Sequence, residues 1–156
     1  MAEDAEQLAT MGRVGNGSPS GVSALFHALV AEDWVSLAVV CAEVGERAWW
    51  LVQALEQIGA QGPRPLRTLN VLGVTAARAA AMAHALSPGK LRAAAPQRYL
   101  VATDSPVLNP ASLEVVMACD AVLLLLEEGR TRIPAARRLV ELIGRERLMG
   151  AVLGSW

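Results

Sequence analysis

The residues with the clearest chemical meaning lie between Cys41 and Trp50, directly after an apolar run that is rich in valine. Residues 37–41 predict a buried strand, residues 48–58 carry a helical pattern, and Gly45 marks a turn between them. A strand, a short loop and a helix in this order point the free N–H groups of the helix start at a single place, where a phosphate can bind. Phosphate chemistry is therefore the first function to consider for this segment.

The residue types needed for phosphoryl transfer are missing from this loop. The nucleotide-binding pattern G-x-x-x-x-G-K-[ST] uses glycine for close backbone approach, lysine for the phosphate charge and a hydroxyl for Mg²⁺. The corresponding places hold Arg47, Ala48, Trp49 and Trp50. The single lysine, Lys90, lies far along the chain, so no shift of alignment brings it into the loop. The segment is typical of a P-loop that has lost its chemical groups.

Composition favours one compact domain without nucleic-acid or metal chemistry. The chain has 156 residues, of which 53% are hydrophobic, and a net charge of −1. That length allows one core, and the charge gives no general attraction to nucleic acid or to anionic membranes. Cys41 and Cys119 lie in or beside apolar segments and are expected to be free core thiols, while His27 and His84 have no ligand neighbours. We expect no metal site.

Residues 1–21 are expected to form a disordered leader, because turn-forming residues dominate their second half, and residues 22–156 the folded domain. The first six residues are acidic, unlike a secretory signal, and no apolar run reaches the roughly 18 residues of a membrane helix. The expected location is the cytoplasm, with no direct membrane insertion.

Strand and helix patterns alternate along this domain. They predict a single three-layer α/β domain with a mostly parallel sheet of about five strands and helices on both faces. The run at 121–126 is unbroken, which indicates a central strand that is buried on both faces. The predicted strands are 36–41, 66–74, 99–103, 121–126 and 148–153, and the predicted helices are 23–30, 47–58, 76–86, 110–118 and 133–143.

Ligand sites in such folds lie at the carboxyl ends of the strands. The residues expected there are 43–48, 104–109, 127–132 and Gly154. These four groups form the whole candidate site.

The C-terminal half carries motifs that resemble a known family. They are Asp104-Ser-Pro106, Ala118-Cys-Asp120 with the apolar strand after it, Gly129-Arg-Thr-Arg132, and Met149-Gly-Ala-Val-Leu-Gly154. In order and spacing over about fifty residues they resemble the bacterial tyrosine-kinase-type P-loop domain of polysaccharide co-polymerase systems, within the wider MinD/ParA group. Residues 24–29 and 43–46 resemble the front of that domain more loosely. The resemblance implies a P-loop NTPase-like fold.

The resemblance also implies where a nucleotide pocket would lie. Asp104 corresponds to the carboxylate that holds Mg²⁺ through water, and Gly154 stands where the wider group has an asparagine that reads the base. Residues 70–74 lack the family's second acidic pair, and the sole tyrosine, Tyr99, lies in a predicted strand rather than in a tail. The degenerate pocket then consists of Glu43, Gly45, Glu46, Arg47, Trp49, Asp104 and Gly154.

Each of these residues has a plainer structural alternative. Asp104 can cap a turn or the following helix. Of Trp49 and Trp50, one can fill the empty pocket while the other packs or contacts a partner. Arg47 can attract an anion, or it can pair with the neighbouring glutamates at positions 43 and 46.

The leading hypothesis is a non-catalytic scaffold or regulatory subunit that acts by protein–protein interaction in bacterial polysaccharide biosynthesis or export. The expected partner is a protein, such as a membrane-bound polysaccharide assembly component that recruits this chain to the inner face of the membrane, and a homo- or hetero-oligomer is expected. The candidate contacts with this partner are Trp50, Arg130, Arg132, Arg137 and Arg138. The alternative for the four arginines is that they lie on a solvated helix face.

The alternative hypothesis is a divergent ATPase or kinase in which Arg47 replaces the P-loop lysine. Only this alternative requires ATP and Mg²⁺, and no cofactor is expected otherwise. A Rossmann-type small-molecule binder would need a glycine-rich first turn, for which the single Gly45 is too little.

Overall fold

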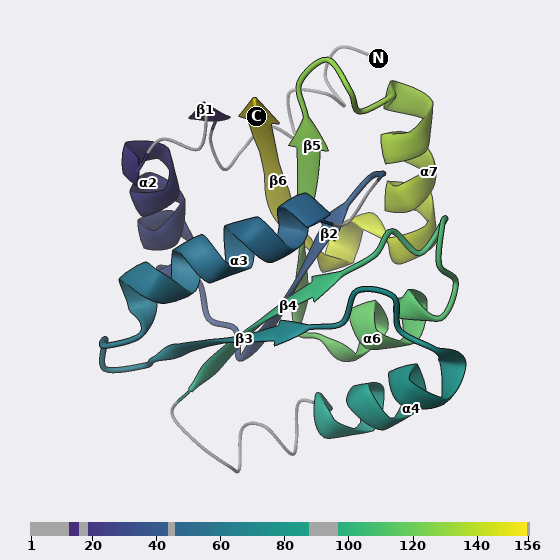
Figure 1. The fold of residues 1–156 in the computed structure, drawn as a ribbon, viewed down its shortest axis with the longest axis horizontal. Helices are drawn as coiled ribbons and strands as arrows, with labels where there is room; N and C mark the ends of the chain where they lie inside the picture. The colour runs from purple at the N-terminus through teal and green to yellow at the C-terminus, as the bar shows by residue number, and fades with distance from the viewer. Residues whose placement is uncertain (1–12, 16–18, 44–45, 88–96, 156) are drawn as a thin grey trace.

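The computed structural model describes residues 13–15, 19–43, 46–87 and 97–155. They form one α/β domain around a six-stranded, all-parallel sheet in the order β1-β6-β5-β2-β4-β3 (Figure 1). The strands are β1 (Arg13–Gly15), β2 (Ser36–Cys41), β3 (Leu66–Asn70), β4 (Arg98–Thr103), β5 (Ala121–Glu127) and β6 (Leu148–Ser155).

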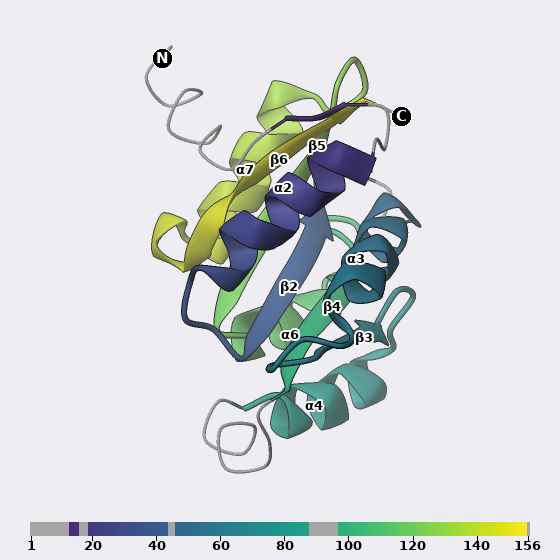
Figure 2. The ribbon, with the colours of Figure 1, turned by 90° about the vertical axis from the view of Figure 1, so that its left-hand side faces the viewer.

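Helices cover both faces of the sheet. On one face lie α2 (Pro19–Val30) and α3 (Glu46–Gly59), and on the other lie α4 (Ala76–Ala85), α6 (Ser112–Ala118) and α7 (Ile133–Ile143). A short 3₁₀ helix, η1 (Arg145–Arg147), leads into β6. Figures 1 and 2 show α3 crossing over β2 with α2 beside it. The predicted three-layer α/β architecture is confirmed.

The helix that follows β2 lies on one face of the sheet, and the helices that follow its two neighbouring strands lie on the other. β2 lies between β4 and β5, with Val40 opposite Thr103 and Cys41 opposite Leu125, so the carboxyl ends of the three strands meet at one edge. The chain leaves β2 towards α3 on one face, whereas it leaves β4 and β5 towards α6 and α7 on the other face. Such a divergence between neighbouring strands opens a crevice at the carboxyl edge of a parallel sheet. The arrangement is consistent with a three-layer P-loop-like fold.

Two elements lie inside the segment expected as a leader. β1 pairs in parallel with β6, with Arg13 opposite Leu153, and α2 begins at Pro19 rather than at Ser23. A three-residue strand is too short to produce a readable alternation, and proline is well tolerated in the first turn of a helix. Residues 1–12 and 16–18 lie outside the described residues.

The second strand ends earlier than predicted. β3 stops at Asn70, whose side-chain oxygen accepts a hydrogen bond from Leu72 N–H at 3.1 Å. Gly73 then adopts a positive φ of 67°, a turn conformation that glycine adopts without strain. The apolar residues Val71 and Val74 suggested a longer strand. They belong to the turn after β3, and their side chains are buried there.

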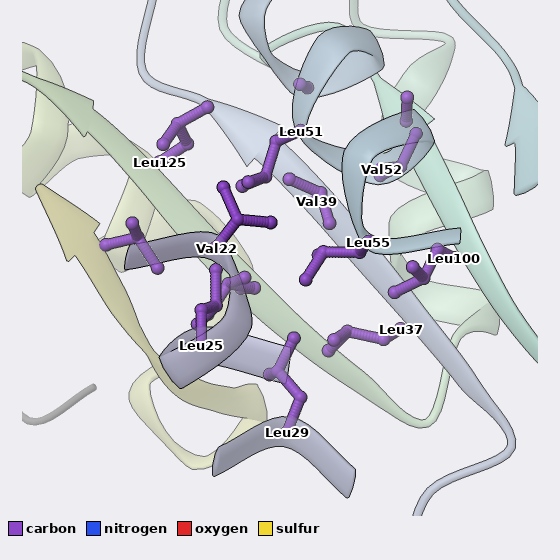
Figure 3. Packing of buried hydrophobic residues seen from close by; sticks show 14 of the residues in the cluster. Val22, Leu25, Leu29, Leu37, Val39, Leu51, Val52, Leu55, Leu100 and Leu125 are labelled. Carbon is purple, nitrogen blue, oxygen red and sulfur yellow. The ribbon is translucent and has the colours of Figure 1, made fainter. Parts of the chain in front are cut away.

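The core consists of two apolar clusters, one under each helical layer. Figure 3 shows the first cluster, in which sheet residues such as Val39 and Leu100 pack against Leu51 and Leu55 of α3 and Leu25 of α2. All six residues of β2 are buried. The prediction that 121–126 forms a central strand is confirmed, because β5 lies between β2 and β6 with its middle residues fully buried.

A polar and aromatic cluster lies at the edge of the sheet where β2 and β4 begin, opposite the carboxyl ends of the strands. The indole N–H of Trp34 donates to the Leu29 carbonyl at 2.7 Å. The Arg98 guanidinium lies 4.8 Å from the centre of that indole ring and donates to the Val30 and Glu32 carbonyls at 3.3 and 3.1 Å. Burial lowers the pKa of Arg98 below its usual value. The contacts hold the end of α2 against the start of β4, far from the carboxyl edge.

Gly59 is predicted to be irreplaceable at the end of α3. A Cβ at this position would lie 2.7 Å from side-chain atoms of Leu66 and Phe26. Gly59→Ala should therefore lower the free energy of unfolding by about 1–3 kcal/mol, as overpacking does. Urea denaturation measures the loss. Gly62→Ala is the matched control, because its Cβ would meet only a carbonyl oxygen at 3.7 Å; equal stability of the two variants would contradict the packing account.

Candidate functional site

The carboxyl ends of the three central strands bring together four side chains of different chemistry. Arg47, Asp104 and Glu127 all act electrostatically on the Cys41 thiol, so the starts of the loops after β2, β4 and β5 converge there. Arg47 and Asp104 belong to the pocket expected from the sequence. Glu127 closes β5 and was expected at this edge only as part of its loop.

The Cys41 thiol occupies the base of this edge and is chemically quiet. Ala48, in the first turn of α3, donates its backbone N–H to the thiol. Burial is the larger effect, and it raises the pKa of Cys41 to about 12, so the thiol stays protonated at neutral pH. An N–H group that a phosphate-binding loop would offer to its ligand is therefore directed at an internal sulfur.

Asp104 ties two loops together. Its Oδ2 accepts hydrogen bonds from Gly73 N–H at 2.7 Å and from Asn109 Nδ2 at 3.1 Å. Asn109 Nδ2 also donates to the Val74 carbonyl at 3.1 Å. Through Oδ2, the Asp104 carboxylate thus joins the loop after β3 to the loop after β4.

The loop after β4 satisfies its own polar groups. The Ser105 carbonyl accepts from Leu108 N–H and Asn109 N–H, both at 2.9 Å. Ser112 Oγ lies 3.0 Å from the Asp104 carbonyl and 2.8 Å from that of Asn109. Of the two structural roles considered for Asp104, its contacts agree with capping of the turn. It does not cap α6, whose N-cap residue is Ala111 and makes no side-chain cap.

The loop after β5 is closed in a similar way. Glu127 N–H donates to Thr131 Oγ1 at 2.7 Å, and the Glu127 carbonyl accepts from Thr131 N–H at 2.9 Å. Arg130 forms an ion pair with the Glu127 carboxylate at 3.5 Å. Arg132 is exposed at the start of α7, and Arg137 and Arg138 are exposed along it. The four arginines therefore line one loop and the helix that follows it.

The two tryptophans of α3 have different surroundings. Trp49 is partly buried and packs against the apolar cluster under α2 and α3, whereas Trp50 is 38% exposed. Arg47 and Glu43 are half-buried near the start of this helix. Gly45 lies outside the described residues, and Glu46 is described only as the first helical residue.

Gly154 is part of the sheet and not of a binding loop. It pairs with Glu127 on one side and with Val14 on the other, and its carbonyl accepts from Glu128 N–H at 2.8 Å. Its backbone groups therefore support three neighbouring segments.

The residues at this edge do not fit Mg·ATP. The lysine position holds Arg47 and the hydroxyl position a tryptophan, while Oδ2 of Asp104 already accepts two hydrogen bonds. Among the described residues, no group of three or more histidine, cysteine or acidic side chains could hold a metal ion.

Apolar side chains project from the two loops that flank this edge. Leu108, in the loop after β4, is 64% exposed, and Ile133, which follows the loop after β5, is 74% exposed. Val107 is also exposed. Val107 and Leu108 lie in the range 104–109 that was expected at this edge, but their exposure was not predicted, because a single apolar residue in a loop has no periodicity.

Comparison of the chain with protein-family models, with curated proteins and with solved structures finds no match. Within the part of the chain that the structure describes, no helix has the length and apolar character of a membrane span.

Asp104 is predicted to contribute to stability through its two donors. Asp104→Ala leaves Gly73 N–H and the Asn109 amide without this acceptor, and it should lower the free energy of unfolding by about 1–3 kcal/mol. The exposed Glu141→Ala on α7 is the control, with an expected change within about 0.5 kcal/mol. Chemical denaturation with and without MgCl₂ measures both. A Mg²⁺-dependent stabilisation that disappears in Asp104→Ala would instead assign the carboxylate to a metal.

Proposed function

We propose that this chain is a P-loop-derived domain that does not transfer phosphoryl groups and that acts by binding a protein partner at the carboxyl edge of its sheet. The observation that carries the proposal is the bonding of Asp104. The carboxylate best placed for Mg²⁺ joins two loops of the protein through Gly73 and Asn109.

Phosphoryl transfer depends on positive charge and metal placed around the transferred group. At this edge Arg47 is half-buried, and the Cys41 thiol feels the opposite charge of Glu127 as well as that of Arg47. The Ala48 N–H at the start of α3 is directed at the Cys41 thiol. Each group that could stabilise a triphosphate is thus absent, replaced or engaged within the protein, which supports a binding function over catalysis.

The same edge has the composition of a contact surface. Leu108, in the loop after β4, and Ile133, the first residue of α7, expose large apolar side chains beside turns that form internal hydrogen bonds. Arg132 lies exposed next to Ile133. Apolar anchors beside arginine are typical of protein interfaces, where arginine can meet a partner's carboxylate. A partner with an apolar segment flanked by acidic residues would suit this surface.

The resemblance to domains of polysaccharide co-polymerase systems indicates which partner to test first. A membrane-bound component of polysaccharide synthesis or export would bring the chain to the inner face of the membrane. No cofactor is needed for this role.

Mg·ATP is predicted not to bind. At about 1 mM nucleotide, calorimetry should give no binding heat and the melting temperature should not change, because a ligand stabilises only the state that binds it. The competing ATPase hypothesis uses the positive charge that Arg47 supplies near the Cys41 thiol. Micromolar affinity that is lost in Arg47→Ala but kept in the exposed Arg138→Ala would favour that hypothesis and contradict ours.

A photo-crosslinking side chain at position 108 is predicted to capture a protein partner in cells that produce the chain. Ile133→Glu should reduce this capture at least several-fold, because the substitution places a charge in the centre of the apolar contact. The matched position is Leu142, which is 43% exposed at the other end of α7. Crosslinks are quantified by mass spectrometry. Equal capture from positions 108 and 142, or no effect of Ile133→Glu, would exclude the carboxyl edge as the binding surface.

A further inference from the structure

The loop before α7 and the first half of this helix form a basic surface. Residues 130–138 contain no acidic residue. Arg130 already pairs with Glu127, whereas Arg132 and Arg138 form no ion pair with any described residue. The exposed arginines of this basic surface are Arg130, Arg132, Arg137 and Arg138. An occupant with negative charge is therefore favoured here.

The same surface also needs an apolar contact. Ile133 lies within it and is 74% exposed, and Leu108 is exposed at the same edge of the sheet. Glu128 precedes the surface and Glu141 follows it, both exposed, so positive charge prevails only between them. Exposed ion pairs alone contribute little, on the order of 0–1 kcal/mol each. A segment that binds here must therefore combine carboxylates with large apolar side chains.

The segment that precedes β1 has this composition. Residues 1–12 contain Glu3, Asp4 and Glu6 and have no lysine, arginine or histidine. Their large apolar residues are Met1, Leu8 and Met11. The segment is thus complementary to the basic surface in charge, and it supplies apolar side chains of its own.

The position of β1 brings this segment close to the basic surface. Arg13 lies opposite Leu153, which lies opposite Leu126 near the end of β5. β1 is therefore two strand spacings, about 10 Å, from the strand that leads into the basic surface. Figure 2 shows β1 beside the end of β6, with α7 behind this part of the sheet. Twelve extended residues span up to about 40 Å, and α7 is about 16 Å long, so the segment is long enough to reach the whole surface.

We infer that residues 1–12 bind the basic surface of the same chain and compete there with the protein partner. Connection through β1 gives the segment an effective concentration on the order of millimolar, so a weak contact is enough to occupy the surface. The partner proposed above has the same chemistry, an apolar segment flanked by acidic residues, and it uses the same Arg132 and Ile133. The competition rests on the proposed function, whereas the binding of residues 1–12 does not.

A photo-crosslinking side chain at position 8 of the purified full chain tests the binding without any partner. It should react within the same chain with the peptide that contains Ile133. The double variant Arg132→Glu, Arg138→Glu should reduce the yield at least several-fold, because like charges then face each other. Arg78→Glu on α4 is the matched control, since Arg78 is also exposed but lies outside the basic surface, and it should leave the yield unchanged.

A charge exchange tests the pairing itself. Adding Glu3→Arg and Glu6→Arg to the double variant should recover at least part of the crosslink, because opposite charges then meet again. Mass spectrometry of a mixture of isotopically labelled and unlabelled protein distinguishes crosslinks within one chain from those between copies. Circular dichroism checks that each variant is folded.

The competition is tested in cells through the crosslinking side chain at position 108. The triple variant Glu3→Gln, Asp4→Asn, Glu6→Gln should raise capture of the protein partner at least several-fold, because the segment loses its charge and releases the surface. Ile133→Glu in the same background should still reduce capture, since it acts on the partner contact directly.

The two claims fail separately. No crosslink from position 8 to the basic surface, or a yield that charge reversal does not change, would overturn the binding of residues 1–12 and leave the partner proposal intact. Crosslinks found only between labelled and unlabelled copies would assign the segment to a neighbouring chain and overturn binding within one chain. Equal capture by the wild type and the triple variant would overturn the competition. Loss of all capture from position 108 would instead contradict the proposed function.

Discussion

The rest of the structure depends on the complete burial of β2 between β4 and β5. Every residue of this strand is enclosed, so its neighbours must cover both faces and both edges. The burial forces the chain that leaves Cys41 to turn at the same edge where β4 and β5 end. Whatever chemistry the fold could support must use the few residues that follow these three strands, and here those residues stabilise the turns.

Hydrogen bonds at the strand ends engage side chains that would otherwise be available to a ligand. Asp104 holds the loops after β3 and β4 together, and at the other edge Asp120 does comparable work by accepting from Val35 N–H at 2.7 Å. Both carboxylates accept hydrogen bonds from backbone N–H groups of a neighbouring loop. Under the proposed function, Asp104 contributes to the stability of the turn and not to phosphate chemistry.

Much of the fold could be predicted from the sequence, because long apolar runs identify buried strands. The runs at 36–41 and 121–126 predicted β2 and β5 nearly to the residue. β1 could not be found, since three residues show no pattern and its pairing with β6 is a long-range contact. Arg98 was overlooked for a similar reason. Its role depends on the Trp34 ring and on two carbonyls at the end of α2, and spacing along the sequence gives no sign of them.

The candidate site was predictable as a place but not as a set of contacts. Strand order brings Arg47, Asp104 and Glu127 around Cys41, as the rule for parallel sheets indicates. The partners of Asp104 depend on the turn at Gly73, where the sequence predicted only an interruption within a longer strand. Exposure of Leu108 and Ile133 is likewise a property of loop geometry, which periodicity does not describe.

The pairing of β1 with β6 has a consequence for the order in which the protein folds. Residues 13–15 are synthesised well before residues 153–155, the strand residues with which they pair. This edge of the sheet can therefore be completed only after residues 153–155 have left the ribosome. Until then the earlier strands must associate through contacts nearer in sequence, and this late step adds to the time that a parallel sheet needs to form.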